Sequence, residues 1–342
     1  MAIRNAGNKV TISTPFDEKK DYFEDECRLI DTQFNRKGKN PLKDFCLMLW
    51  YCKLLKQEKP NVVLSYTIKP NVYGGMACQI CGVPQIVNIT GLGSAIENSG
   101  WLQHLTILLY KIGLRKADII FFQNKANMNF CVKRGMIKSK HVLLPGSGVN
   151  LKYHSLQPYP PEKGKVHFLF IGRILKHKGI EEYFKAAKII KTKYPNTEFY
   201  ILGRVEGNYQ KQLNQLMKVG CIKHFGVTSD VRPYIKSVEC TVMPSYYEGM
   251  SNVNLESAAN GRPVITSDVP GCREMVDDGI TGFLVKPRDT DSLIKAMERF
   301  ILMPYEQKRK MGVAARRKVE REFDRQIVVD AYIKVLESFA NV

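Results

Sequence analysis

Short runs of β-branched and aliphatic residues alternate with longer helical patterns along the whole chain. Such alternation is typical of strand–helix units, in which crossover helices connect the strands of a parallel sheet. The strand-like runs form two series. The first series is KVTIST, NVVLSY, PQIVNIT, ADIIFFQ and HVLLPG, and the second is VHFLFIG, EFYILG, IKHFG, CTVMPS, PVITSD and GFLV. The sequence therefore predicts an α/β protein with two doubly wound parallel sheets.

A segment rich in proline and polar residues, YHSLQPYPPEKGK, separates the two series and is typical of a linker. The 342 residues are enough for two domains of ordinary size. We predict a first domain over residues 1–155 and a second that begins at residue 156. Ligands of parallel sheets bind at the carboxyl ends of the strands, so two facing domains predict a ligand in the cleft between them.

The stretch from Met243 to Asp268 is the most informative part of the chain. It predicts a strand, a tight loop, a helix and a second strand. Glu248 lies in the loop, and Glu256 follows eight residues later in the first turns of the helix. The residues between them would present backbone N–H groups at a helix N-terminus, which favours an anion. A diphosphate on these amides, with the carboxylates on flanking hydroxyl groups, fits that pattern.

A companion motif, FIGRILKHKGI, predicts a buried strand that ends at Gly172 and leads into a basic loop. Glycine permits close approach of a ligand to the backbone. Arg173 and Lys178 follow in the loop. Two cations at the carboxyl end of a strand can neutralise a diphosphate, arginine through its fork and lysine as a point charge.

Taken together, these motifs resemble the retaining family-4 glycosyltransferases with the two-domain GT-B fold. The resemblance rests on YEGMSNVNLE, GRILKHKG, FYILGR and GFLV, and it spans essentially the whole chain. The loops NITGLGSA and LLPGSGVN further resemble bacterial enzymes that extend polyprenyl-diphosphate-linked sugars for surface polysaccharide or glycan assembly. The resemblance implies two facing Rossmann-like domains and a C-terminal helix, residues 326–342, that packs back on the first domain. The second domain then covers residues 156–325.

The resemblance also implies roles for individual residues. Arg173 and Lys178 would hold the donor diphosphate and stabilise the leaving group, and Glu248 would bind hydroxyl groups of the donor sugar. Glu256 would bind the ribose. Further donor contacts are expected at Gly172, Gly249, Met250, Ser251, Asn252, Val253, Gly226 and Val227. The implied reaction retains the anomeric configuration without an enzymic nucleophile and requires no cofactor or metal.

On the acceptor side, the glycine-rich loop after PQIVNIT supplies Gly91, Gly93 and Ser94, and the loop SYTIKPN supplies Lys69 for an acceptor phosphate. Many members of the family have a histidine where this chain has Thr90 to Ser94, so the usual sugar contact cannot be assigned. The chain opens with what reads as the end of a helix, AIRNAG. We therefore expect either that about one strand–loop–helix unit is missing from the first domain or that this domain is atypical.

The net charge of +19 favours anionic partners, either phosphorylated substrates or anionic lipid. The segment Trp101 to Lys116 combines apolar residues with a basic end, which fits a helix in a membrane interface and equally a core helix. Nine scattered cysteines without a secretory signal indicate a reducing cytoplasm. We expect a cytoplasmic protein that associates peripherally with the inner face of the plasma membrane, with a nucleotide sugar and a lipid-linked saccharide as substrates.

Other readings of the sequence remain open at this point. A UDP-sugar 2-epimerase shares the GT-B architecture, and a truncated relative could bind nucleotides without catalysis. Asp289-Thr290-Asp291 matches a metal-binding pattern of another glycosyltransferase fold, but its position before SLIKAMERF predicts a helix N-cap. The basic run from Lys308 to Glu322 lacks interleaved aromatic residues, which favours a solvated helix face over a nucleic-acid site.

Overall fold

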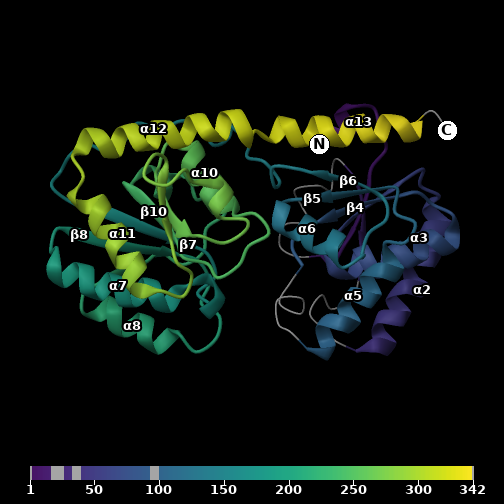
Figure 1. Ribbon diagram of the computed structural model, residues 1–342, viewed down its shortest axis with the longest axis horizontal. Helices are drawn as coiled ribbons and strands as arrows, with labels where there is room; N and C mark the ends of the chain where they lie inside the picture. The colour runs from purple at the N-terminus through teal and green to yellow at the C-terminus, as the bar shows by residue number, and fades with distance from the viewer. Residues whose placement is uncertain (1, 17–26, 33–39, 93–99, 341–342) are drawn as a thin grey trace. The chain divides into compact units, whose positions relative to one another are not determined.

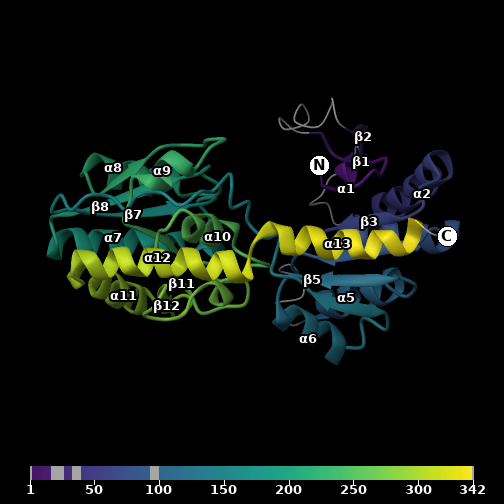
Figure 2. The same cartoon turned by 90° about the horizontal axis from the view of Figure 1, so that it is seen from above.

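The computed structural model describes residues 2–16, 27–32, 40–92 and 100–340. The chain forms two compact units (Figures 1 and 2). Unit 1 comprises Met1–Leu144 and Ile327–Val342, and unit 2 comprises Pro145–Gln326.

Unit 1 is built around a parallel sheet with the strand order β3-β4-β5-β6. A further pair of parallel strands, β1 and β2, forms a sheet of its own. The elements of unit 1 are α1 (Ala2–Asn5), β1 (Thr11–Thr14), β2 (Arg28–Asp31), α2 (Pro41–Glu58), β3 (Val63–Tyr66), the π-helix η2 (Pro70–Gly74), α3 (Gly75–Cys81), β4 (Gln85–Ile89), α5 (Trp101–Gly113), β5 (Ile119–Phe122), α6 (Lys125–Lys133), β6 (Lys140–Leu143) and α13 (Arg325–Ala340).

The central strands β4 and β5 are buried on both faces of the unit 1 sheet. Alternate residues of each strand point to opposite faces, and helices pack against both. On one face, side chains of β4 and β5 such as Val87 and Phe122 pack with η2, α5 and α6. On the other face, Phe121 packs against α13, where Tyr332 also accepts a hydrogen bond of 2.6 Å from Asn88 Nδ2. Figure 1 shows the sheet between α13 on one side and α2 and α5 on the other.

Unit 2 contains one six-stranded parallel sheet with the order β9-β8-β7-β10-β11-β12. In chain order this is 3-2-1-4-5-6, the order of a dinucleotide-binding Rossmann sheet. The elements of unit 2 are β7 (Val166–Ile171), the 3-10 helix η3 (Lys176–Lys178), α7 (Ile180–Lys193), β8 (Thr197–Leu202), α8 (Gln210–Lys218), β9 (Ile222–His224), α9 (Arg232–Lys236), β10 (Cys240–Met243), α10 (Asn252–Ala259), β11 (Val264–Ser267), the 3-10 helix η4 (Arg273–Met275), β12 (Gly282–Val285), α11 (Thr290–Leu302) and α12 (Tyr305–Glu322).

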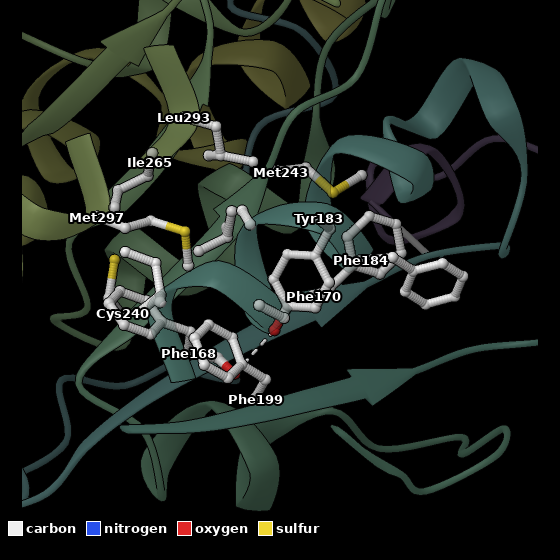
Figure 3. Close-up of a cluster of buried hydrophobic side chains, with 14 of the residues drawn as sticks. Phe168, Phe170, Tyr183, Phe184, Phe199, Cys240, Met243, Ile265, Leu293 and Met297 are labelled. Atoms are coloured by element: carbon white, nitrogen blue, oxygen red, sulfur yellow. Dashed lines mark hydrogen bonds between the residues drawn. The ribbon is translucent and has the colours of Figure 1, made fainter. Parts of the chain in front are cut away.

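The core of unit 2 follows from the apolar run of β7, whose residues alternate between the two faces of the sheet. Phe168 and Phe170 pack with α7 and α11 on one face, while Leu169 and Ile171 pack near α9 on the other. Figure 3 shows the first of these clusters. In it, the hydroxyl of Tyr183 donates to the carbonyl of Phe168 at 3.1 Å, which satisfies a polar group in an otherwise apolar core.

The structure confirms most of the predicted elements and corrects one boundary. Every strand of the two predicted series is present, Gly7 follows α1 with a φ of 86°, and Asp289 caps α11 by accepting from Ser292 N at 2.9 Å. β2 was not predicted. The domain boundary expected after residue 155 lies after Leu144 instead, because Val149 joins the core of unit 2 and its backbone pairs with Phe323 and Asp324.

Arg262 holds residues 157 and 158, which the sequence predicts to lie in a linker, against the rest of unit 2. Its side chain is fully buried, and its guanidinium donates to six backbone carbonyls, those of Ile235, Gln157, Asn260, Gly261, Pro158 and Lys236. Burial lowers the pKa of Arg262 to about 10, so the group stays charged at neutral pH.

Substitution Arg262→Met keeps much of the side-chain volume but leaves buried carbonyls without donors. Each unsatisfied buried acceptor costs about 1 to 3 kcal/mol. We therefore expect the melting temperature to fall by about 6 °C or more, since about 1 kcal/mol shifts a domain of this size by 2 to 4 °C. Thermal unfolding measures the shift, with Arg115→Met at an exposed position as the control. Equal melting temperatures for both variants would contradict this role.

Candidate functional site

The strand order of unit 2 reverses between β7 and β10, and the candidate site lies at this point. The two strands pair in parallel, so their carboxyl ends meet at the same edge of the sheet. The loop after β7 carries Arg173 and Lys178, and the loop after β10 carries Glu248. Ligands of open parallel sheets bind in the crevice outside the strand ends where the order reverses.

Three glycines lie at the carboxyl ends of adjacent strands, so no side chains cover the backbone there. Gly172, Gly203 and Gly226 follow β7, β8 and β9, and all three have positive φ angles. A Cβ atom on Gly203 would lie 2.0 Å from the carbonyl oxygen of Gly172, and the amide of Gly203 donates to Gly226 O at 2.6 Å. A side chain at Gly203 would therefore force the strand ends apart.

Lys178 and Glu248 form an ion pair across the two loops. Lys178 Nζ lies 2.5 Å from Glu248 Oε1, and both side chains are largely buried. Ser245 Oγ donates to the same carboxylate oxygen at 2.9 Å. Burial weakens solvent screening, so this pair interacts more strongly than a surface pair.

Residues next to Lys178 and Glu248 also make contacts between the loops after β7 and β10. The rings of His177 and Tyr247 stack with centroids 5.1 Å apart and an interplanar angle of 9°. The amide of Tyr246 donates to His177 O at 2.9 Å. Burial, together with the nearby Lys178 and Arg173, lowers the pKa of His177, which favours the neutral ring beside Lys178.

Close backbone packing fixes the same two loops. Gly179, with a φ of 74°, caps the start of α7, and a Cβ atom there would lie 2.0 Å from the carbonyl oxygen of Pro244. Only glycine permits both this φ and this approach. The geometry of the Lys178–Glu248 pair therefore depends on backbone contacts as well as on charge.

Arg173 lies in the same loop but is more exposed. Its Nη1 is 3.2 Å from Glu206 Oε2, with side chains that are 47% and 29% exposed. Glu206 comes from the loop after β8, and the sequence analysis did not identify it. Such exposed pairs contribute little to stability, so Arg173 can exchange its partner at low cost.

The predicted anion site at the start of α10 is only partly available. Ser251 caps the helix, its Oγ accepting from Asn254 N at 3.4 Å. Its own amide donates to Gly271 O at 2.7 Å, so Ser251 N–H is not free for a ligand. The amides of Asn252 and Val253 lie in the first helical turn and have no acceptor within the helix. The side chain of Met250 is buried in the core, against Gly146.

Glu256 lies on α10, one turn beyond the cap. Burial raises its pKa to about 7, while the nearby Arg325 lowers it in part. Gly226 and Val227 lie at the carboxyl end of β9, and Val227 is 66% exposed. The structure thus places Glu256, Gly226 and Val227 in the same unit as the Lys178–Glu248 pair.

The predicted acceptor-side residues belong to unit 1. Lys69 Nζ lies 2.6 Å from Asp44 Oδ1, and Tyr73 donates to Asp44 Oδ2 at 3.1 Å. Asp44 is buried, so the charge of Lys69 already has a close partner. Gly91 follows β4, whereas Gly93 and Ser94 lie outside the described residues.

Neither a metal-binding cluster nor a membrane-spanning helix is present among the described residues. Residues 2–16, 27–32, 40–92 and 100–340 contain no group of three or more His, Cys, Asp or Glu side chains that could hold a metal ion. Within those same ranges, no helix combines the length and the apolar character that crossing a membrane requires.

Comparison with known families identifies the chain. The family described as "Glycosyl transferases group 1" matches residues 155–318, and "Glycosyl transferase 4-like" matches residues 1–124. The two matches cover both units, so the chain belongs to the group 1 and 4-like glycosyltransferases and is a glycosyltransferase.

Curated relatives agree with this assignment. The chain is 24% identical to the N,N'-diacetylbacillosaminyl-diphospho-undecaprenol alpha-1,3-N-acetylgalactosaminyltransferase of Campylobacter jejuni, over 98% of this chain and 93% of the relative. It is 28% identical to the capsular polysaccharide biosynthesis glycosyltransferase CapM of Staphylococcus aureus, over 84% of this chain and 78% of the relative. The UDP-Gal:alpha-D-GlcNAc-diphosphoundecaprenol alpha-1,3-galactosyltransferase of Escherichia coli is 26% identical, over 82% of this chain and 76% of the relative.

Solved structures confirm the GT-B fold predicted from the sequence. Sucrose-phosphate synthase from Thermosynechococcus elongatus superimposes with a TM-score of 0.80 at 21% identity, covering 100% of this chain and 92% of that protein. Anabaena HepE in complex with UDP and glucose has a TM-score of 0.80 at 16% identity, covering 98% of this chain and 94% of HepE.

Substitution Glu256→Gln tests the electrostatics of the site. Because the native pKa of about 7 lies above the ordinary 4.5, the native state binds more protons than the unfolded chain between these values. Stability from this group is therefore full below pH 4.5 and is lost as pH rises through 7. The glutamine variant stays neutral, so we expect it to melt above the wild type at pH 8 and close to it at pH 5.

Thermal unfolding at the two pH values measures this difference, with Glu162→Gln at an exposed position as the control. If the difference in melting temperature between wild type and Glu256→Gln were the same at pH 5 and pH 8, the pKa of Glu256 would not be raised.

Proposed function

We propose that this glycosyltransferase transfers a hexose or N-acetylhexosamine from a UDP-linked donor to a polyprenyl-diphosphate-linked saccharide, with retention of configuration. The observation that carries the proposal is the Lys178–Glu248 pair at the point where the strand order of unit 2 reverses. The names of two relatives supply the acceptor class, because both describe saccharides linked to diphospho-undecaprenol. One of those names specifies UDP-Gal, and HepE is similar in fold and binds UDP.

In this proposal, different charged residues bind the diphosphate and the ribose of the donor. Lys178 and Arg173 would contact the diphosphate, with the amides of Asn252 and Val253 at the start of α10 as further donors. Glu256 would accept hydrogen bonds from the ribose hydroxyls, and its carboxylate would be better suited to this in the charged form.

The proposed reaction breaks the bond between the sugar C1 and a diphosphate oxygen. An acceptor hydroxyl attacks C1 from the face that the diphosphate leaves, and its proton passes to the leaving diphosphate. Lys178 and Arg173 would stabilise the negative charge that develops there, which is the largest contribution in many such sites. Glu248 would orient the sugar through its hydroxyls, and the two cations would make a metal ion unnecessary.

Substitution Lys178→Met should abolish transfer while preserving the fold. Removing a group that stabilises transition-state charge costs about 10²- to 10³-fold in kcat. Lys176→Met is a matched control, because Lys176 lies two residues away, is 70% exposed and pairs only at 3.8 Å with Glu181. The turnover of both variants is measured as transfer of labelled sugar from UDP-sugars to a polyprenyl-diphosphate-linked acceptor. A folded Lys178→Met variant with normal turnover would overturn the site.

We also propose that unit 1 associates peripherally with an anionic inner-leaflet membrane. Helix α5 buries one face, while Trp101, Leu105, Leu108 and Ile112 leave the other face apolar and exposed. Exposed Lys111 lies in the last turn of α5, and exposed Arg115 and Lys116 follow the helix. On α2, Leu42, Phe45 and Leu49 form a second exposed apolar row. An apolar face with basic neighbours is the composition of helices that lie in a membrane interface.

The double substitution Trp101→Ser and Leu105→Ser should reduce binding to lipid vesicles at least about fivefold, because it removes two large apolar side chains from the proposed interface. Co-sedimentation with vesicles that contain 30 mol% phosphatidylglycerol measures binding. Met217→Ser with Val219→Ser removes exposed apolar side chains at α8 as the control. Equal vesicle binding by both double variants would contradict the proposed surface.

A further inference from the structure

A basic groove of about 520 Å³ lies on unit 2, between α12 and the loop that precedes β12. Six of the residues that line it are charged: Asp277, Arg309, Lys310, Arg317, Lys318 and Arg321. Five of these residues are cations and one is an acid. Their formal charges sum to +4, which favours an anionic ligand.

Part of this charge is balanced within the protein. Lys318 Nζ lies 2.9 Å from Asp277 Oδ1 and 3.1 Å from Glu322 Oε2. Arg309 pairs with Glu306 at 2.9 Å, and Arg321 pairs with Glu322. Among the residues that the structure describes, Lys310 and Arg317 have no ion-pair partner. Both side chains are exposed and line the groove.

The spacing of the cations on α12 brings them to one face. Lys310, Arg317 and Arg321 are separated by seven and four residues, which places them along the same stripe of the helix. Arg317 and Arg321 lie one helical turn apart, so their like charges repel each other. A bound anion would relieve this repulsion.

The groove is separate from the donor site within unit 2. The loop 277–281 directly precedes β12, so it lies at the amino ends of the strands. Arg173, Lys178 and Glu248 follow β7 and β10, at the carboxyl ends. Because all strands of this sheet run parallel, the two sites lie at opposite edges of the sheet.

We propose that this groove binds a compact ligand with several phosphate charges, distinct from the sugar-nucleotide donor. Its volume falls within the range of small-molecule sites. Arginine forks bind phosphate oxygens in pairs, and lysine adds a point charge. Ile280, Val313 and Ala314 give the groove apolar wall surface beside the cations. Cations that converge on a hollow suit a small polyanion better than the flat surface of a membrane.

Isothermal titration calorimetry with sodium tripolyphosphate tests this proposal, with saturating UDP present to occupy the donor site. The double variant Lys310→Gln, Arg317→Gln removes the two unpaired charges. Lys211→Gln with Lys218→Gln is a matched control, because it removes two exposed charges at the same seven-residue spacing on α8. We expect binding to weaken at least about tenfold in the first double variant and less than about twofold in the control.

The two double variants distinguish specific binding in the groove from nonspecific binding to surface charge. No binding of tripolyphosphate to the wild type, or equal losses in both double variants, would overturn the proposal. A parallel measurement uses vesicles with 30 mol% phosphatidylglycerol. Vesicle binding that depends on Lys310 and Arg317, with tripolyphosphate binding unchanged, would identify the groove as a lipid surface and also overturn the proposal.

A repeat of the titration without UDP keeps this result independent of the proposed function. If UDP itself does not bind, the donor site fails, but the comparison between the two double variants still decides whether the groove binds phosphate.

Discussion

The parallel pairing of β7 with β10 determines where the charged groups of the proposed donor site lie. The two strands come from different halves of unit 2, yet their carboxyl ends share one edge of the sheet. Lys178 and Glu248 are seventy residues apart in sequence and meet at 2.5 Å because of this pairing. Gly179 permits the close packing on Pro244 that keeps the two loops in contact.

Both cations that we propose for the diphosphate have carboxylate partners within the protein. Lys178 pairs with the largely buried Glu248, and Arg173 pairs with the more exposed Glu206. Burying an ion pair has a large desolvation cost, which only good geometry and further hydrogen bonds offset. The bond from Ser245 Oγ to Glu248 supplies one of these. A diphosphate would therefore enter a site whose charges are already held in place.

Much of the fold could be predicted from the sequence, because the apolar strands and the motifs that follow them are local signals. The glycine, arginine and lysine after β7 and the glutamates around α10 could be found in the same way. Glu206 could not, because it reaches Arg173 from the loop after the neighbouring strand β8 and no local motif marks it. The Asp44–Lys69 ion pair also depends on tertiary packing, as does the hydrogen bond from the Ser251 amide to Gly271 O.

Thermal unfolding with and without UDP, GDP and ADP, repeated on Glu256→Ala, tests the central claim that unit 2 binds a nucleoside diphosphate at this edge of its sheet. A ligand at 100 times its dissociation constant stabilises the native state by about 2.7 kcal/mol, which is a shift of several degrees. The account predicts a rise that is largest with UDP and is lost in the variant. No rise with any nucleotide, or the same rise in Glu256→Ala, would contradict it.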